Sequence, residues 1–243
     1  MRFFAALLKS RYCLRTRGAV AYTRLNFREE NMMTTTNPKR KMPDDLKRCV
    51  EFHGHVCPGL IYGYRVAKEA IRLMNLRRAV DEEVVAICEN DSCAVDALQV
   101  LLGTVAGKGN LIIKNLGKNA YTVLNRSKRQ AYRFSRKTRY TYAGKNKSMF
   151  NRLEAAYANK TASEGDLRDL KRLKVNDLLA RPFEDIFTTT AVPFEEPHYA
   201  RLAPSEPCAI CGEMTMTAKM VGLGDGRQAC IPCSRKKSSK KNI

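Results

Sequence analysis

Residues 52–59 read FHGHVCPG and hold two of the chain's three histidines and a cysteine within five positions. Proline is favoured as the first residue of a helix, so Pro58 predicts a helix start with Cys57 as its N-cap. A cysteine at a helix N-terminus faces free N–H groups and the positive end of the helix dipole, and both favour the thiolate over the thiol. Cys57 is therefore predicted to be a reactive thiol or a metal ligand.

A second cysteine is predicted at the start of another helix. Apolar residues at helical spacing predict the first helix over 60–76, and the β-rich stretch 83–89 predicts a strand after it. The strand runs into Asn-Asp-Ser at 90–92, residue types that cap helices, before a helix expected to end near Leu102. Cys93 therefore lies at the head of this helix.

Two helix starts, each with a candidate thiolate, are expected to converge at Cys57 and Cys93. The imidazoles of His53 or His55 would then complete an N/S site for zinc, nickel or iron. In an enzyme of this kind Cys57 or a metal-bound water would be the nucleophile, with His53 or His55 as general base and Cys93 beside them. The alternative is that the histidines are turn residues and the cysteines are small core hydrophobes.

The remainder of the core predicts an α+β fold in which an antiparallel sheet is packed with helices. Strands separated by turn residues are expected at 111–114, 121–125 and 129–136, and together they predict an antiparallel meander. Apolar residues return to helical spacing over 149–179, and a break in this pattern predicts a helical hairpin with Ser163 as the cap of its second helix.

Two Cys-x2-Cys pairs separated by eighteen residues lie near the C-terminus. Each pair presents two thiolates from one tight turn and the spacer suits a hairpin, so the spacing predicts tetrahedral zinc. Four protein ligands leave no position for water, so this zinc would be structural and stabilise a module too small for its own core. Four buried free thiols are the alternative. The predicted ligands are Cys208, Cys211, Cys230 and Cys233.

The composition excludes several classes of protein. The longest apolar runs have six and five residues, short of the roughly 18 that a bilayer span requires, so no membrane association is predicted. Nine cysteines without a secretory signal pattern predict metal or thiol chemistry in a reducing compartment, the cytoplasm. The formal charge of +20 is concentrated toward the two ends of the chain, which weakens it as an argument for nucleic-acid binding.

Changes in composition predict the boundaries between parts of the chain. Four prolines between residues 193 and 207 predict an extended connector before the last cysteines. The predicted parts are a basic flexible extension (1–41), an α+β core (42–190), the proline-rich connector (191–206), a four-cysteine zinc finger (207–234) and a basic tail (235–243).

The N-terminal extension carries ten Lys/Arg and only two acidic residues. An organelle transit peptide has this character, but so does a reading frame extended upstream of its true start. We favour the upstream start, with translation beginning at Met32, Met33 or Met42.

A basic stretch at 126–147 holds nine Lys/Arg and no acidic residue, interleaved with aromatic residues. Such interleaving occurs in grooves that stack nucleic-acid bases, but it is also what a half-buried strand produces. We favour the half-buried strand, and we expect an anionic ligand or partner ahead of nucleic acid.

Four short motifs resemble the FmdE family, named for the E component of formylmethanofuran dehydrogenase. They are HGHVCPG at 53–59, NDSCAVDALQ at 90–99, GKGNL at 107–111, and the C-terminal CAIC and CIPC pairs. The resemblance implies an α+β core, a homodimer, a core metal site around the His/Cys motif and a treble-clef zinc finger. The residues it implies for the core site are His53, His55, Cys57 and Cys93, with Asp91, Lys108 and Asn110 as ligand-binding neighbours.

One position departs from the family pattern, because Thr104 stands where the family commonly has a cysteine.

The leading hypothesis from the resemblance is a cytoplasmic metal-binding protein, accessory to molybdenum- or tungsten-dependent one-carbon oxidoreduction or a related redox pathway, with a redox enzyme or an anionic small molecule as partner. The alternatives are a metal- or thiol-dependent enzyme that uses the His/Cys site, and a nucleic-acid-binding zinc-finger protein.

Overall fold

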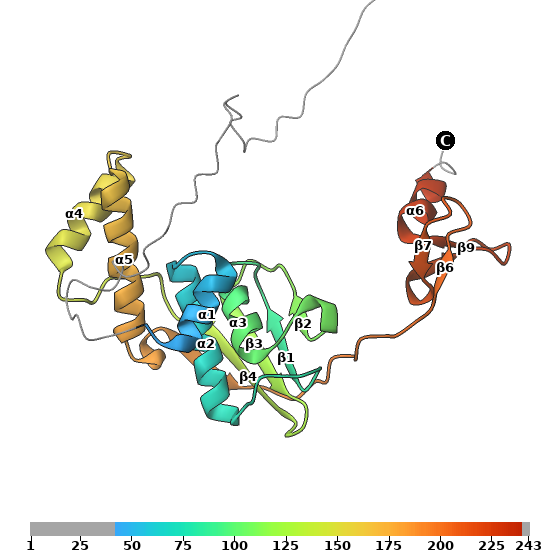
Figure 1. Cartoon of the computed structure of the whole chain (residues 1–243), viewed down its shortest axis with the longest axis horizontal. Helices are drawn as coiled ribbons and strands as arrows, with labels where there is room; N and C mark the ends of the chain where they lie inside the picture. The colour runs from blue at the N-terminus through green and yellow to red at the C-terminus, as the bar shows by residue number, and fades with distance from the viewer. Residues whose placement is uncertain (1–41, 240–243) are drawn as a thin grey trace, which may run out of the picture.

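The structure, a computed structural model, describes residues 42–239 (Figure 1). The predicted extension at 1–41 and the end of the predicted tail at 240–243 lie outside the described residues. An α+β unit with a five-stranded sheet leads into an extended connector, which ends in a small module of two hairpins and a helix (Figure 1). The predicted fold class is therefore confirmed.

The helices are α1 (Asp44–His53), α2 (Pro58–Met74), α3 (Ala94–Leu102), α4 (Lys147–Ala158), α5 (Glu164–Ala180) and α6 (Ile231–Ser239), with short 3-10 turns at η2 (Ala106–Lys108), η3 (Phe183–Asp185) and η4 (Thr217–Lys219). The strands of the large sheet are β1 (Val84–Cys88), β2 (Leu111–Ile113), β3 (Ala120–Asn125), β4 (Gln130–Arg136) and β5 (Phe187–Ala191). The small hairpins pair β6 (Ser205–Pro207) with β7 (Met214–Met216), and β8 (Met220–Gly222) with β9 (Gln228–Cys230).

The large sheet is mixed, which corrects the predicted antiparallel meander. Its order is β2-β1-β3-β4-β5, so β1 lies between two strands that were expected to be neighbours. β1 and β2 run parallel and the other pairs are antiparallel. The reason is that β1, read as VVAIC, is buried on both faces and takes an inner position, while α3 provides the crossover that a parallel neighbour requires.

Two elements of the α+β unit, α1 and β5, were missing from the sequence-based expectation, and helix α6 occupies the first part of the predicted basic tail. Helix α1 carries only a narrow apolar stripe, Leu46, Cys49 and Val50, on an otherwise polar segment. Strand β5 reads FTTTA and pairs with β4, with only Phe187 buried. Both elements owe their stability to packing against the sheet and its helices, which a weak local pattern does not reveal.

The helices and the connector cover opposite faces of the sheet. Residues of α1, α2, α3 and α5 form the main core with one set of strand side chains. On the other face Val85 and Leu124 pack with Val192 and Phe194 at the start of the connector. The guanidinium of Arg126 holds the connector further along through the Glu196 carboxylate at 2.8 Å.

Within residues 42–239, no helix is both long enough and apolar enough to cross a lipid bilayer.

The helical hairpin of α4 and α5 forms as expected. Ser163 caps α5 by accepting a hydrogen bond from the Asp166 backbone N–H, and the Asp166 carboxylate accepts one from the Ser163 backbone N–H in return.

A close backbone approach joins α2 to α3. A Cβ atom at Gly63 would lie 2.0 Å from the carbonyl oxygen of Ala94, so the two backbones touch where residue 63 has no side chain. One turn earlier on α2, a Cβ at Gly59 would meet the Cβ of Cys93 at 3.0 Å. The two glycines therefore let the start of α3 lie against the first turns of α2.

Replacing Gly63 with alanine tests this contact. The added methyl group forces α2 and α3 apart, and we expect a loss of about 1–3 kcal/mol in the free energy of unfolding, as in other overpacked cores. Urea denaturation followed by circular dichroism measures the loss. The control is Gly165→Ala in the first turn of α5, where the nearest atoms leave room for a methyl group; equal stability of the two variants would contradict the close contact.

Candidate functional site

The His-x-His-x-Cys segment forms the turn between two helices. His53 is the last residue of α1, and Gly54 ends that helix in a left-handed conformation with φ 88°. Only glycine adopts this conformation without strain, and it reverses the chain so that α2 begins four residues later. As a result the ligand atoms of His53, His55 and Cys57 all lie within 4.8 Å of one another.

Cys57 is the N-cap of α2, as the sequence predicted. Its Sγ accepts a hydrogen bond from the backbone N–H of Leu60 at 3.3 Å and lies 3.7 Å from Nε2 of His53. The rings of His53 and His55 stand 4.5 Å apart, centroid to centroid. Desolvation, followed by the charge of the neighbouring His53, lowers the pKa of His55, which favours the neutral imidazole that binds metals.

The structure brings Cys93 to this group from the other helix start. A Cβ at Gly59 would stand 3.5 Å from Sγ of Cys93 and 3.7 Å from Sγ of Cys57, so both sulfurs flank the same small space. Burial, followed by the charge of Cys57, raises the pKa of the Cys93 thiol. Cys93 thus lies near Cys57, although it is not one of the three residues whose ligand atoms lie within 4.8 Å of one another.

Asp96 is the site residue that the sequence analysis missed. Its Oδ2 lies 2.7 Å from Nδ1 of His53, and its Oδ1 accepts a hydrogen bond from the Gln99 side chain at 3.1 Å. A carboxylate on Nδ1 orients the ring and leaves Nε2 free to bind a metal, an arrangement common around metal-bound histidines. The available signal was the spacing of Asp96 three residues after Cys93, which places both on one face of α3.

An open depression of about 420 Å³ adjoins the His/Cys group. His53, Cys93 and Asp96 line it on one side, and the apolar side chains of Leu111 and Ile113 from β2 line it as well. A small molecule therefore has access to the edge of the site. Of the three residues predicted as ligand-binding neighbours, Asp91 lines this depression.

The other two predicted neighbours make contacts with the main chain. The Asn110 side chain is fully buried, donates to the carbonyl oxygens of Asp81 and Val84 at 2.9 Å each, and accepts from the Val105 N–H. Lys108 donates to two carbonyl oxygens of the same loop, at residues 79 and 80. The structure thus gives both side chains a part in fixing the loop before β1, and their binding of a ligand stays a prediction.

Thr104, at the position where a third cysteine was expected, is also buried. Its hydroxyl donates to the carbonyl oxygen of Leu98, in the middle of α3, at 3.4 Å. The side-chain groups that could bind a metal at the core site are therefore two imidazoles and two cysteine sulfurs. Nitrogen and sulfur ligands of this kind are those that zinc, nickel and iron prefer, whereas calcium and magnesium prefer oxygen ligands.

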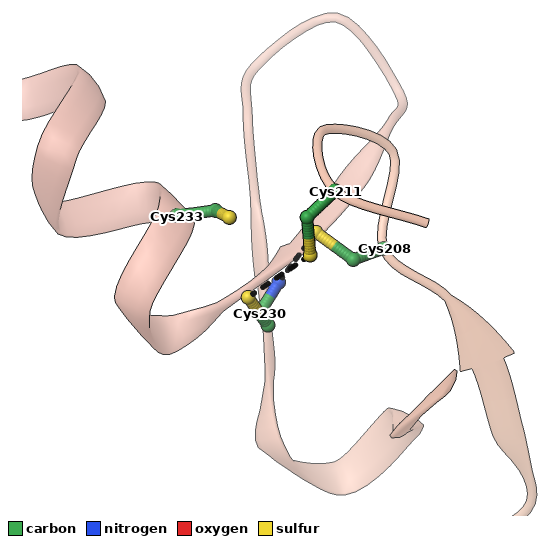
Figure 2. A group of neighbouring side chains, drawn as sticks. All are labelled: Cys208, Cys211, Cys230 and Cys233. Carbon is green, nitrogen blue, oxygen red and sulfur yellow. Dashed lines mark hydrogen bonds between the residues drawn. The ribbon is translucent and has the colours of Figure 1, made fainter. Parts of the chain in front are cut away.

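The second group of residues that could hold a metal ion is the C-terminal set of four cysteines. Their Sγ atoms all lie within 4.8 Å of one another, and Figure 2 shows the side chains directed toward a common centre. Cys208 and Cys211 come from the turn between β6 and β7, while Cys230 ends β9 and Cys233 lies in the first turn of α6. This order of knuckle, hairpin and helix is that of a treble-clef finger.

Backbone groups of the finger favour thiolate at its first ligand. Hydrogen bonds from the N–H groups of Cys211, Cys230 and Ile210 lower the pKa of Cys208 to about 6. Gly212 follows the knuckle with φ 79°, which lets the chain turn back into β7. The site is closed, because four sulfurs surround the centre, and it therefore suits structural zinc.

The remaining described cysteines lie in the core. Cys49 and Cys88 are fully buried, and desolvation raises the pKa of Cys49 to about 11 and that of Cys88 to about 12. They are inert thiols in an apolar environment. All eight cysteines within residues 42–239 are free, which agrees with metal or thiol chemistry and not with a disulfide framework.

The fold and the two clusters define a class of protein, an α+β protein with a His/Cys cluster of potential metal ligands at a helix–helix junction and a separate four-cysteine finger. The family model described as "FmdE, Molybdenum formylmethanofuran dehydrogenase operon" matches residues 52–188. The chain belongs to the FmdE family, and the resemblance found in the four motifs is confirmed.

Two individual proteins are similar to the chain. A "Probable S-adenosyl-L-methionine-binding protein" of Archaeoglobus fulgidus is 30% identical over 210 residues, which are 82% of this chain and 54% of the relative. The chain thus spans about half the length of that relative. The solved structure of a tungsten formylmethanofuran dehydrogenase FmdE-like protein from Syntrophus aciditrophicus matches with 21% identity and a TM-score of 0.47, covering 78% of this chain and 89% of that one.

Removing zinc should unfold the finger and leave the α+β unit intact. The module has few buried residues, so we expect the binding of metal to supply its folding free energy. After treatment with a strong chelator, hydrogen exchange of peptides within 205–236 should accelerate at least about tenfold, as expected for loss of local structure. Peptides from 120–136 in the sheet serve as the control. Unchanged protection at 205–236 would rule out a structural metal.

Asp96→Asn should weaken metal binding at the core site without unfolding the protein. The neutral amide is a weaker acceptor than the carboxylate for the Nδ1–H of His53 and orients the ring less firmly, and loss of such a partner typically costs about 10–100-fold in affinity. A competition titration against a chromophoric chelator, with the finger already filled, measures the change. Asp91→Asn is the matched control, since Asp91 is exposed and lines the depression without contacting His53 in the structure. Equal affinities for both variants would remove Asp96 from the site.

Proposed function

We propose that this chain is a metal-binding protein with two sites of different purpose. The finger would hold zinc as a structural ion, and the group of His53, His55, Cys57 and Cys93 would hold a second transition metal, zinc, nickel or iron. The observation that carries the proposal is that the ligand atoms of His53, His55 and Cys57 lie within 4.8 Å of one another. The Asp96 carboxylate lies 2.7 Å from Nδ1 of His53.

The core site and the finger differ in the number of positions left to solvent. Four cysteine sulfurs enclose the finger centre, whereas the core group adjoins an open depression. A site with an open position binds or activates a small molecule, while a closed one serves stability. We therefore assign the functional role to the core site.

For the biological role, we propose an accessory protein of molybdenum- or tungsten-dependent one-carbon oxidoreduction. Support comes from the family, whose description refers to the operon of molybdenum formylmethanofuran dehydrogenase. On this proposal the protein is cytoplasmic, forms a homodimer and works beside a redox enzyme.

A second candidate is an enzyme that uses the core site itself. This alternative is favoured by the depression, because Asp91 and Asp96 line it together with His53 and Cys93. In it, Cys57 or a metal-bound water would attack the substrate and His53 or His55 would carry the proton. The metal requirement is the same as for the accessory protein, so a test of metal content applies to both.

Metal analysis of purified full-length variants tests the proposal. Wild-type protein should bind two metal ions per chain, His53→Ala and Cys57→Ser should each lose one, and Cys211→Ser should lose the other. His198→Ala is the matched control, because His198 is an exposed histidine outside both clusters and its removal should leave two ions bound. A metal content of one in wild type, unaffected by His53→Ala, would overturn the proposal.

The accessory role has a separate readout. In cells that depend on the protein, His53→Ala should lower molybdenum- or tungsten-dependent one-carbon oxidation measured in extracts, while His198→Ala should restore wild-type rates. Full rates in the His53→Ala strain would contradict the accessory role, even if the metal is bound as proposed.

A further inference from the structure

A cavity of about 930 Å³ lies at the base of the helical hairpin. Its wall is formed by the loop 142–146, the start of α4, the second half of α5 and the chain that follows it to Asp185. None of its lining residues belongs to the His/Cys group or to the finger. The loop is part of the basic stretch 126–147, whose charge the proposed function does not use.

Three cationic residues line this cavity. Lys145, Arg172 and Arg181 line it, against the two carboxylates of Asp177 and Asp185. Arg172 also pairs with Asp169 at 3.0 Å, outside the lining. The lining therefore carries one more positive than negative charge.

Asp177 is already engaged within the protein. Its buried carboxylate accepts hydrogen bonds from the Tyr140 hydroxyl at 2.7 Å, from the Ala143 N–H at 3.2 Å and from the Arg181 guanidinium at 2.6 Å. These contacts anchor Arg181 at the wall. The Arg181 Nε is nevertheless buried without a hydrogen-bond partner, so the guanidinium is not fully satisfied.

The start of α4 adds to the positive potential. Asn146 is its N-cap and lines the cavity, and no side chain caps the free N–H groups of the first turn. The N-terminus of a twelve-residue helix carries a partial positive charge. This end, Lys145 and Arg172 all lie on the same cavity.

The rest of the wall is apolar and partly aromatic. Tyr142 lines the cavity and is stacked on Phe150, with ring centroids 4.5 Å apart and planes 6° from parallel. The stacking holds the tyrosine ring in place. Met149, Leu173 and Pro182 complete the apolar surface.

From this combination we propose that the cavity binds a small organic anion, a phosphate or carboxylate group attached to a flat apolar ring. Lys145 and Arg172 bind the anionic group, since charge-assisted hydrogen bonds to such groups are strong. The ring packs against the side chains of Tyr142, Met149 and Leu173. The basic stretch of the sequence thus contributes to a ligand site as well as to a half-buried strand.

Titration calorimetry of the full chain with phenyl phosphate tests the site. Benzoate replaces the phosphate by a carboxylate, inorganic phosphate lacks the ring, and benzylamine reverses the charge. We expect phenyl phosphate or benzoate to bind saturably, inorganic phosphate to bind more weakly, and benzylamine not to bind. Binding should weaken with added salt, because it depends on charge.

Variants locate the binding in the cavity. Lys145→Gln and Arg172→Gln should each weaken binding about tenfold, the loss of one charge-assisted contact. The matched control is Arg168→Gln, one turn earlier on α5, where Arg168 is exposed and pairs with Glu164; its affinity should stay within about twofold of wild type, as for a surface ion pair. Cys57→Ser should bind as wild type does, which separates this site from the proposed core metal.

Two results would overturn the proposal. One is the absence of saturable binding by both aromatic anions at millimolar concentration. The other is equal affinity of wild type, Lys145→Gln and Arg172→Gln, which would place the anion elsewhere on this basic protein.

Discussion

The backbone contact between α2 and α3 is the constraint on which the site depends. At Gly63 the two helices approach until a single methyl group would collide with the Ala94 carbonyl. Any side chain there would separate the helix starts and move Cys93 away from Cys57. The same contact positions Asp96 against His53, because Asp96 lies in the first turn of α3, directly after Ala94 and the N-cap Cys93. A packing feature without polar side chains therefore determines the chemistry of the polar ones.

The two clusters of metal-binding residues are built by different means. In the finger, each pair of cysteines is presented by one local turn, and on the proposed function a bound metal would contribute the free energy that the small core does not supply. In the core site, a turn presents His53, His55 and Cys57, and a folded sheet with its helices brings the rest. The finger cluster therefore depends mainly on local turns, whereas the core cluster depends on the tertiary fold.

Sequence reasoning succeeded where the signal was local and strong. The helix start at Pro58, the capping serine of α5 and the strands β3 and β4 all follow from residue patterns within a few positions. It was wrong about the meander, since the order of strands depends on which strand is buried on both faces. It missed α1 and β5, whose weak patterns are stabilised by neighbours distant in the sequence.

Taken alone, the sequence determined the ligand types and their spacing, because helix capping, a left-handed glycine and a Cys-x2-Cys turn all depend on bonds between near neighbours. Only the tertiary structure decided that Asp96 orients His53, that Asn110 and Lys108 bind carbonyl groups of a loop, and that Cys93 reaches Cys57. These contacts join residues far apart in the chain, as with the 43 positions that separate His53 from Asp96. Their formation depends on how closely helices pack, and packing is a property of the whole core and not of any one segment.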